Sequence, residues 1–125
     1  MTENEIGERV IGAAMKVHSA LGPGLLESAY EVCLAHELDS AGLSVRRQVA
    51  LPIVYGDLRL DAGYRLDLLV NGLVVVELKA VEKVTDVHRA QLLSYLKLGR
   101  FKLGYVMNFN VVRLREGIVR MVNGL

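Results

Sequence analysis

The feature that most constrains the fold is a pair of apolar segments joined by a turn signal. Leu66–Val70 and Val74–Lys79 are both rich in leucine or valine, and they flank Asn71-Gly72. An Asn-Gly pair between two such runs is a strong signal for a β-hairpin. We therefore predict two adjacent antiparallel strands. The first runs from Leu58 to Val70, with a break near Ala62-Gly63, and the second runs from Leu73 to Ala80.

Charged residues interrupt this apolar hairpin. Asp67 lies in the first strand, and Glu77 and Lys79 lie in the second. Because side chains alternate along a strand, Glu77 and Lys79 share one face, while Val74, Val76 and Leu78 share the other. An isolated buried charge is strongly unfavourable unless it is paired or bound to a metal. Glu77 and Lys79 therefore either line a solvated face of the sheet or belong to a functional site.

The register of the hairpin decides whether Asp67 joins Glu77. A two-residue turn would place Asp67 opposite Val76, on the face away from Glu77. A three-residue loop of Asn71–Leu73 would pair Asp67 with Glu77 instead. We predict the three-residue loop or a nearby bulge, because only then do Asp67, Glu77 and Lys79 converge. A type I turn with a glycine bulge makes such a loop, and Gly72 suits its left-handed position.

Helical spacing of apolar residues predicts three helices in the rest of the chain. The first two run from Glu3 to Leu21 and from Leu25 to Ala41, and Gly22-Pro23-Gly24 separates them. Thr85 or Asp86 can cap the third helix, which reaches about Leu98.

The remaining apolar runs predict further strands. They are expected at Val45–Tyr55, at Leu103–Phe109, and in a closing hairpin of Val111–Arg115 and Ile118–Val122. The resulting order, α-α-β-β-β-α-β-β-β, predicts a mixed α/β fold with helices covering a sheet.

Composition narrows the class of protein. A chain of 125 residues, 52% of them hydrophobic, is expected to form a single domain over residues 1–125. A net charge of +1 excludes a broad cationic field for nucleic acid. The single cysteine, Cys33, excludes an internal disulfide and a cysteine-rich zinc site. The lone cysteine suits a reducing compartment, no uncharged run approaches the ~20 apolar residues of a membrane span, and the acidic start of the chain is unlike a secretory signal, so we expect a cytoplasmic protein. A homodimer that forms through an apolar patch or a strand edge is a further expectation.

Two carboxylates on adjacent strands beside a lysine favour one kind of chemistry. Mg²⁺ takes oxygen ligands from one or two carboxylates and keeps several waters. Such a metal activates a water and stabilises charge on a phosphate, and a lysine can orient that water or neutralise the developing charge.

At these residues the sequence resembles the PD-(D/E)XK nuclease superfamily. Asp67 matches the first acidic position and Glu77-Leu78-Lys79 matches the E-x-K element, while Leu66 stands where the motif has its proline. The resemblance implies a restriction-endonuclease-like α-β-β-β-α-β core, here with an extra N-terminal helix and a C-terminal hairpin. It also implies a nuclease that depends on Mg²⁺ or Mn²⁺ and cleaves phosphodiester bonds in nucleic acid, DNA in preference to RNA. Asp67, Glu77 and Lys79 would then be catalytic residues.

Gly24-Leu25-Leu26-Glu27-Ser28-Ala29-Tyr30 is similar to the signature of the GxxExxY family, a small branch of that superfamily. This resemblance covers nearly the whole chain, from Ile11 to Asn123. It implies that Glu27 is a catalytic residue that completes the metal site with Asp67 and Glu77. Position alone favours a different role, in which Glu27 complements the dipole of the helix that it begins.

Gln91-Leu92-Leu93-Ser94-Tyr95 is similar to the Q-x-x-x-Y element of RecB-type nucleases. Gln91 and Tyr95 lie four residues apart on one helix face, and the resemblance implies that they bind substrate near the metal. Partial core burial of Tyr95 and a solvated surface position for His88 are the structural alternatives. The basic residues best suited to a binding rim are Arg46, Arg47, Lys83 and Arg89.

Two other functions compete with the nuclease. One is a catalytically weak or inactive nuclease-fold module that binds nucleic acid or protein. The other is an acid–base enzyme for a small molecule, which would require a deep, closed pocket around the same carboxylates.

Overall fold

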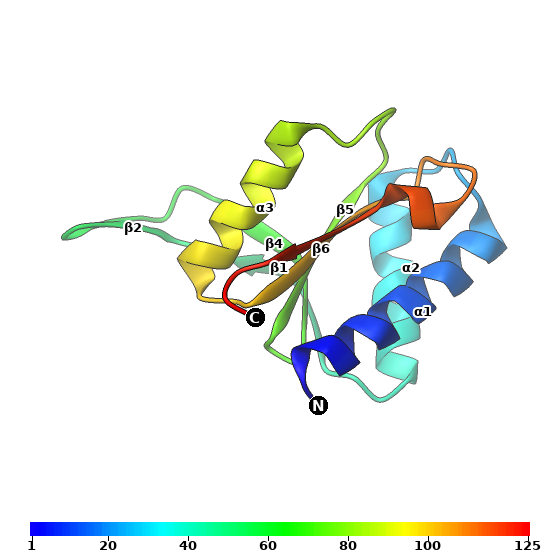
Figure 1. The fold of residues 1–125 in the computed structure, drawn as a ribbon, viewed down its shortest axis with the longest axis horizontal. Helices are drawn as coiled ribbons and strands as arrows, with labels where there is room; N and C mark the ends of the chain where they lie inside the picture. Colours follow the sequence, from blue (N-terminus) through cyan, green and yellow to red (C-terminus); the bar gives the residue numbers. More distant parts are fainter.

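The computed structural model describes all residues from Met1 to Leu125 (Figure 1). Helix α1 (Glu3–Leu21) begins with a capping box, in which the Thr2 hydroxyl accepts from the Glu5 N–H and the Glu5 carboxylate accepts from the Thr2 N–H. Helix α2 (Glu27–Ser40) follows, slightly shorter than predicted, and α3 (Asp86–Gly99) is capped by Thr85. None of these helices combines the length and the apolar character that crossing a membrane requires.

The predicted mixed sheet is confirmed, and it has five strands in the order β1-β4-β5-β6-β7. Strands β5 and β6 are parallel, and every other neighbouring pair is antiparallel. The elements α2, β1, β4, β5, α3 and β6 reproduce the α-β-β-β-α-β core. The strands of the sheet are β1 (Val45–Ala50), β4 (Arg65–Val70), β5 (Val74–Lys79), β6 (Leu103–Asn108) and β7 (Ile118–Val122).

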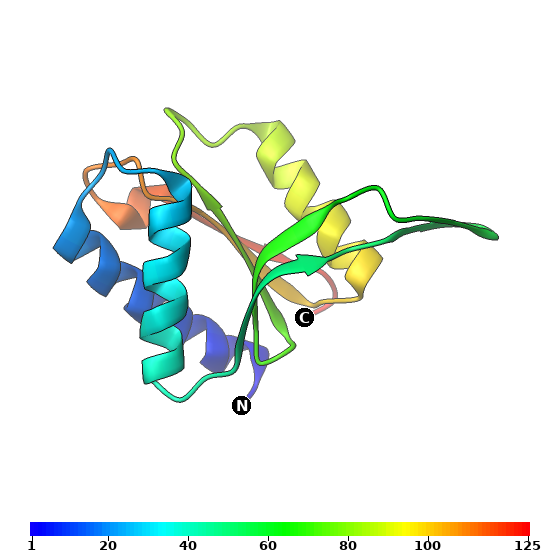
Figure 2. The ribbon, with the colours of Figure 1, turned by 180° about the vertical axis from the view of Figure 1, so that it is seen from behind.

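The sheet separates two apolar cores (Figures 1 and 2). Helices α1 and α2 cover one face, and α3 covers the other. Val74, Val76 and Leu78 of β5 pack toward α1 and α2, as predicted, while Val75 packs toward α3. Strand β5 is therefore buried on both faces, and Glu77 shares the α3 face with Val75.

The predicted hairpin register is confirmed. Val70 pairs with Val74 and Leu68 with Val76, so Asn71–Leu73 is the loop. The expected type I turn is wrong, because Asn71 (φ 52°) and Gly72 (φ 67°) are both left-handed, the pattern of a type I′ turn. The type I′ turn matches the right-handed twist of the flanking strands better than type I does.

Two predicted strands are each divided in the structure. The Val45–Tyr55 segment breaks at Leu51-Pro52, where proline lacks the N–H that a ladder requires. The second strand breaks at 61–64, close to the expected Ala62-Gly63. The outer pieces, β2 (Ile53–Tyr55) and β3 (Leu58–Leu60), form a separate two-stranded arm that projects from the body (Figures 1 and 2).

The predicted closing hairpin is wrong. Val111–Arg115 forms no strand, because the chain turns into a short 3₁₀ helix, η1 (Leu114–Gly117), and β7 pairs with β6 instead. Two contacts with the α1 side explain the difference. The Val111 carbonyl accepts a hydrogen bond from His18 Nε2 at 2.8 Å, and Leu114 is buried in the core beneath α1 and α2.

Candidate active site

The candidate site lies where β4 and β5 diverge. Their pairing ends at Leu68–Val76, although β5 continues to Lys79 beside β6. Beyond that point, side-chain carboxylates accept backbone N–H groups in place of the carbonyls of the neighbouring strand. The Asp67 N–H donates to Glu77 Oε2 at 2.8 Å, and the Leu78 N–H donates to Asp67 Oδ2 at 2.8 Å. The two acids therefore meet in the gap between the strands, as the three-residue loop requires.

Glu77 is an acid buried in the sheet rather than on a solvated face. Its exposed fraction is only 5%. Burial, and then the charge of Asp67, raise its pKa to about 8, although the Asp67 N–H and the Lys79 ammonium oppose the shift. In the protein without a bound cation, Glu77 therefore retains its proton at neutral pH.

The charges of Asp67 and Lys79 act on the same site. Asp67 is half-buried, and burial raises its pKa, while the Leu78 N–H, Gln48 and Lys79 lower it. Lys79 also lowers the pKa of Glu27 and of Glu77. One ammonium group thus lies within electrostatic reach of all three acids predicted for the site.

Glu27 reaches this group from the first position of α2. The preceding loop is held by Tyr30, whose hydroxyl donates to the Gly22 carbonyl at 2.6 Å and accepts from the Leu25 N–H at 3.1 Å. The Tyr30 ring also stacks on Phe109, with ring centroids 4.6 Å apart. Burial, and then the charge of Asp67, raise the pKa of Glu27, so the start of α2 directs this exposed acid toward the strands.

Helix α3 brings Tyr95 to the opposite side of the site. Tyr95 is 7% exposed, which agrees with the core alternative, yet the charges of Glu77 and Asp67 contribute to a raised pKa after burial itself. The Tyr64 ring meets the Tyr95 ring edge-on, with centroids 6.2 Å apart. A pocket formed by the base of the arm and α3 is lined by Ile53, Tyr64, Gln91, Ser94, Tyr95 and Leu98.

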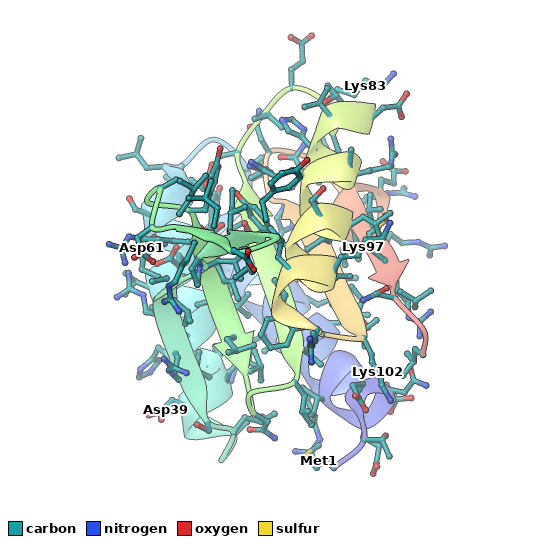
Figure 3. The ribbon with its side chains drawn as sticks, turned by 90° about the vertical axis from the view of Figure 1, so that its left-hand side faces the viewer. Met1, Asp39, Asp61, Lys83, Lys97 and Lys102 are labelled. Atoms are coloured by element: carbon teal, nitrogen blue, oxygen red, sulfur yellow. The ribbon has the colours of Figure 1, made fainter.

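Figure 3 views the molecule from the side of the arm. Side chains of the arm and of α3 gather over the same face of the sheet, with Asp61 marking the arm side and Lys97 marking α3.

His88 takes no part in the pocket, because its Nδ1 accepts from the Thr85 N–H in the capping box of α3. His88 is therefore a helix-capping residue.

The structure adds two residues that the sequence analysis missed, Glu31 and Gln48. Glu31 is 6% exposed, and its Oε1 accepts from Gln48 Nε2 at 2.7 Å. The same Gln48 nitrogen lies 3.3 Å from Asp67 Oδ1. Glu31 follows Glu27 by one helical turn, a spacing that could have identified it. Gln48 carries no comparable signal in the sequence.

Two of the four residues expected on a binding rim have other partners. Arg47 Nη2 lies 2.9 Å from the Glu31 carboxylate, and Arg89 Nη1 lies 3.2 Å from Asp86. Arg47 thus neutralises a buried acid, and Arg89 forms an exposed pair within α3.

The three predicted ligands do not form a closed cluster as they stand. No group of three or more His, Cys, Asp and Glu side chains is arranged to hold a metal ion. The donor chemistry nevertheless fits a hard divalent cation. Asp67 and Glu77 supply only oxygen atoms, each carboxylate keeps free lone pairs beside its hydrogen bonds, and Mg²⁺ requires only one or two carboxylates with water.

The pockets of the molecule also bear on the small-molecule alternative. Four pockets are present, and Glu27, Asp67 and Glu77 line none of them. The deep, closed pocket that an acid–base enzyme would require around these carboxylates is therefore absent.

A comparison of the sequence with protein families agrees with the observed core and with the meeting of Asp67 and Glu77. A family model described as the PD-(D/E)XK nuclease superfamily matches residues 4–121. No curated protein and no solved structure matches the chain. Nucleases of this superfamily generally use divalent metal ions. Since the match spans almost the whole chain, including the strands that carry Asp67 and Glu77, the protein belongs to the PD-(D/E)XK nuclease superfamily.

Proposed function

We propose that this protein is a metal-dependent nuclease that hydrolyses phosphodiester bonds, in DNA in preference to RNA. The observation that supports this most directly is the pair of interlocked carboxylates, Asp67 and Glu77, within reach of the Lys79 ammonium. Glu77 accepts the Asp67 N–H, but an uncharged side chain could do the same in this buried strand, whereas a bound cation would explain why an acid lies there. We also assign the chain to the GxxExxY branch, on Gly24, Glu27 and Tyr30.

In this proposal Glu27, Asp67 and Glu77 hold Mg²⁺ or Mn²⁺. Such an ion, when bound, lowers the pKa of a coordinated water and stabilises negative charge on a phosphate. Asp67 and Glu77 are already held by backbone N–H groups, so they supply the rigid part of the site. Glu27 is exposed at the start of α2, and in the proposal it completes the site from the side opposite α3.

Lys79 has a different role from the acids. It lies two residues after Glu77 on the same face of β5, and it lowers the pKa of each of the three carboxylates. In the proposed reaction its ammonium orients the attacking water and balances charge that develops on the phosphate.

Gln91 and Tyr95 are the proposed substrate contacts. A side-chain amide and a phenol hydroxyl can both donate to phosphate oxygens. The pocket that they line with Tyr64 has aromatic walls, which suit the face of an unpaired base. Because the net charge is only +1, local contacts of this kind would have to supply much of the affinity.

The test is cleavage of end-labelled single-stranded and duplex DNA and RNA by the full chain in Mn²⁺, in Mg²⁺ and in EDTA. We expect metal-dependent products from wild type and none from Asp67→Asn. The matched control is Asp39→Asn, which changes an exposed acid at the opposite end of α2 from Glu27 (Figure 3). Absence of cleavage by wild type, or undiminished cleavage by Asp67→Asn, would overturn the proposal.

A nuclease-fold module with little or no catalytic activity is the second candidate. It is favoured by the absence of a preformed group of three ligands and by the nearly neutral charge. Calorimetry distinguishes the two candidates, because a binding module takes up no Mg²⁺ or Mn²⁺ even at millimolar metal, whereas the nuclease does.

Homodimer formation and a cytoplasmic location stay predictions. The arm offers the apolar surface for self-association, since Tyr55 is 79% exposed and Val54, Leu58 and Leu60 are also exposed. Light scattering at several protein concentrations measures the oligomeric state. The location rests on the lone Cys33, which suits a reducing compartment.

A further inference from the structure

Gln48 has a backbone conformation that its place in the fold does not explain. It lies inside β1 with φ 51°, in the left-handed region that residues other than glycine rarely adopt. Two other such residues have local explanations, since Asn71 lies in the hairpin turn and Arg100 forms the C-cap of α3. Gln48 lies within a strand, where an extended backbone is expected.

The left-handed residue reverses the faces of β1. Val45 packs in the α1–α2 core, whereas Val49 packs against the α3 core, although residues four apart in a regular strand face the same side. Strand β4 reverses at the same level, since Leu66 packs in the α3 core and Leu68 in the α1–α2 core. The residues opposite each other at the two reversals are Gln48 and Asp67, between the Arg47–Leu68 and Val49–Leu66 pairs.

This conformation places the Gln48 amide between two acids. Its Nε2 donates to Glu31 Oε1 at 2.7 Å and to Asp67 Oδ1 at 3.3 Å. The second oxygen of Glu31 accepts from Arg47, whose Nε lies 3.0 Å from it and whose Nη2 lies 2.9 Å from it. Glu31 is thus held from both sides, and it fixes the direction in which the amide points.

Asp67 is oriented by the same contacts. Its Oδ2 accepts from the Leu78 N–H and its Oδ1 accepts from Gln48, so both oxygens have a donor. A carboxylate oxygen has two lone pairs, and the Gln48 bond therefore leaves Oδ1 able to bind a cation. Without the amide, only the Leu78 N–H would orient the Asp67 carboxylate, and Oδ1 would have no donor.

We propose that Gln48 is a positioning residue, held by Glu31 and Arg47, that fixes the Asp67 carboxylate for cation binding. The inference rests on the proposed metal site, because it assigns Asp67 as a ligand. Glu31 is then a buried acid that never touches the ion, and its task is to anchor the amide. Contacts of this kind, made behind the ligands of a metal, typically change metal affinity about 10- to 100-fold.

The test separates this role from a contribution to folding. Gln48→Asn keeps the amide and tolerates the left-handed backbone, but its shorter side chain cannot span the two acids. Gln48→Gly keeps the backbone conformation and removes the amide altogether. The matched control, Arg100→Asn, makes a similar backbone change at the end of α3.

Two quantities are measured on the full chain, the Kd for Mn²⁺ by calorimetry and the melting temperature in EDTA. We expect both Gln48 variants to bind Mn²⁺ about 10- to 100-fold more weakly than wild type, at a temperature where the melting curve in EDTA shows each variant fully folded. Arg100→Asn should keep the wild-type Kd. Wild-type affinity in both Gln48 variants, while Asp67→Asn loses binding, would overturn the positioning role and leave the metal site intact. A wild-type protein that binds no Mn²⁺ would overturn the metal site and the positioning role together.

Discussion

Replacing Glu77 by glutamine tests the electrostatics of the site without any assumption about substrate. In the cation-free protein, burial and the charge of Asp67 raise the pKa of Glu77 from 4.5 to about 8. The unfolded chain therefore releases this proton at a lower pH than the folded chain does. The contribution of Glu77 to stability is complete below pH 4.5 and is lost as the pH rises toward about 8.

The size of the effect follows from that difference in pKa. At about 1.4 kcal/mol per pH unit, the free energy of unfolding lost to ionisation of Glu77 reaches at most about 5 kcal/mol above pH 8, and about 3 kcal/mol at neutral pH. Glutamine has nearly the same shape as a protonated glutamate and cannot ionise. Glu77→Gln should therefore match wild type near pH 4.5 and be more stable by several kcal/mol above pH 8.

The measurement is urea unfolding in EDTA at a series of pH values for wild type, Glu77→Gln and the control Glu82→Gln. Glu82 is exposed, so its substitution should leave the pH dependence of wild type unchanged. The informative quantity is the difference in unfolding free energy between variant and wild type as a function of pH. A difference that stays constant across the range would refute the assignment of Glu77 as a buried acid that is protonated at neutral pH.

Three further substitutions separate the roles of other residues. Lys79→Met should reduce cleavage by about 10²- to 10³-fold. Mn²⁺ should bind at least as tightly as in wild type, because a neighbouring positive charge has been removed. A cleavage assay and calorimetry measure the two effects, and weaker Mn²⁺ binding would contradict this role. Tyr30→Phe removes the hydroxyl that forms hydrogen bonds with Gly22 and Leu25. It should lower the free energy of unfolding, measured in urea, by about 1–3 kcal/mol. Wild-type stability would show that these hydrogen bonds contribute little. Gly117→Ala would bring a Cβ to 2.3 Å from the Asn108 carbonyl oxygen. The resulting backbone shift should lower the free energy of unfolding by about 1–3 kcal/mol in the same assay. An unchanged urea midpoint would show that the 3₁₀ turn adjusts at little cost.

The parts of the site that the sequence predicted depend on contacts close in the chain. The register that joins Asp67 to Glu77 is set by the length of the loop between two apolar runs. Residues 66–79 allow a loop of two or three residues, and the convergence of the charged side chains favoured three. Glu27 was identified through a resemblance, because Asp67 of β4 and Lys79 of β5, whose charges act on its pKa, lie far from it in the chain. Local patterning alone left its role open.

The parts that were missed or wrong depend on contacts far apart in the chain. Val111–Arg115 has an alternating pattern typical of a strand, but His18 and the core beneath α1 draw this segment toward the helices. The roles of Gln48 and Glu31 arise from an unusual backbone conformation and from a helix and a strand that meet only in the folded chain. A periodicity argument detects neither the backbone conformation of Gln48 nor its contacts, although the one-turn spacing from Glu27 points to Glu31.

The position of Glu77 connects the stability of the fold with its activity. Strand β5 is buried on both faces, so an apolar residue at this position would remove the repulsion from Asp67 and the penalty of burial. In the cation-free protein this repulsion favours protonation of Glu77, and a divalent cation would reverse the preference, because it attracts both carboxylates at once. Binding of the cation would then release a proton and stabilise the end of β5 where the strands separate. The same feature that weakens the cation-free fold as the pH rises from 4.5 toward about 8 is thus the feature that would give the protein its affinity for metal.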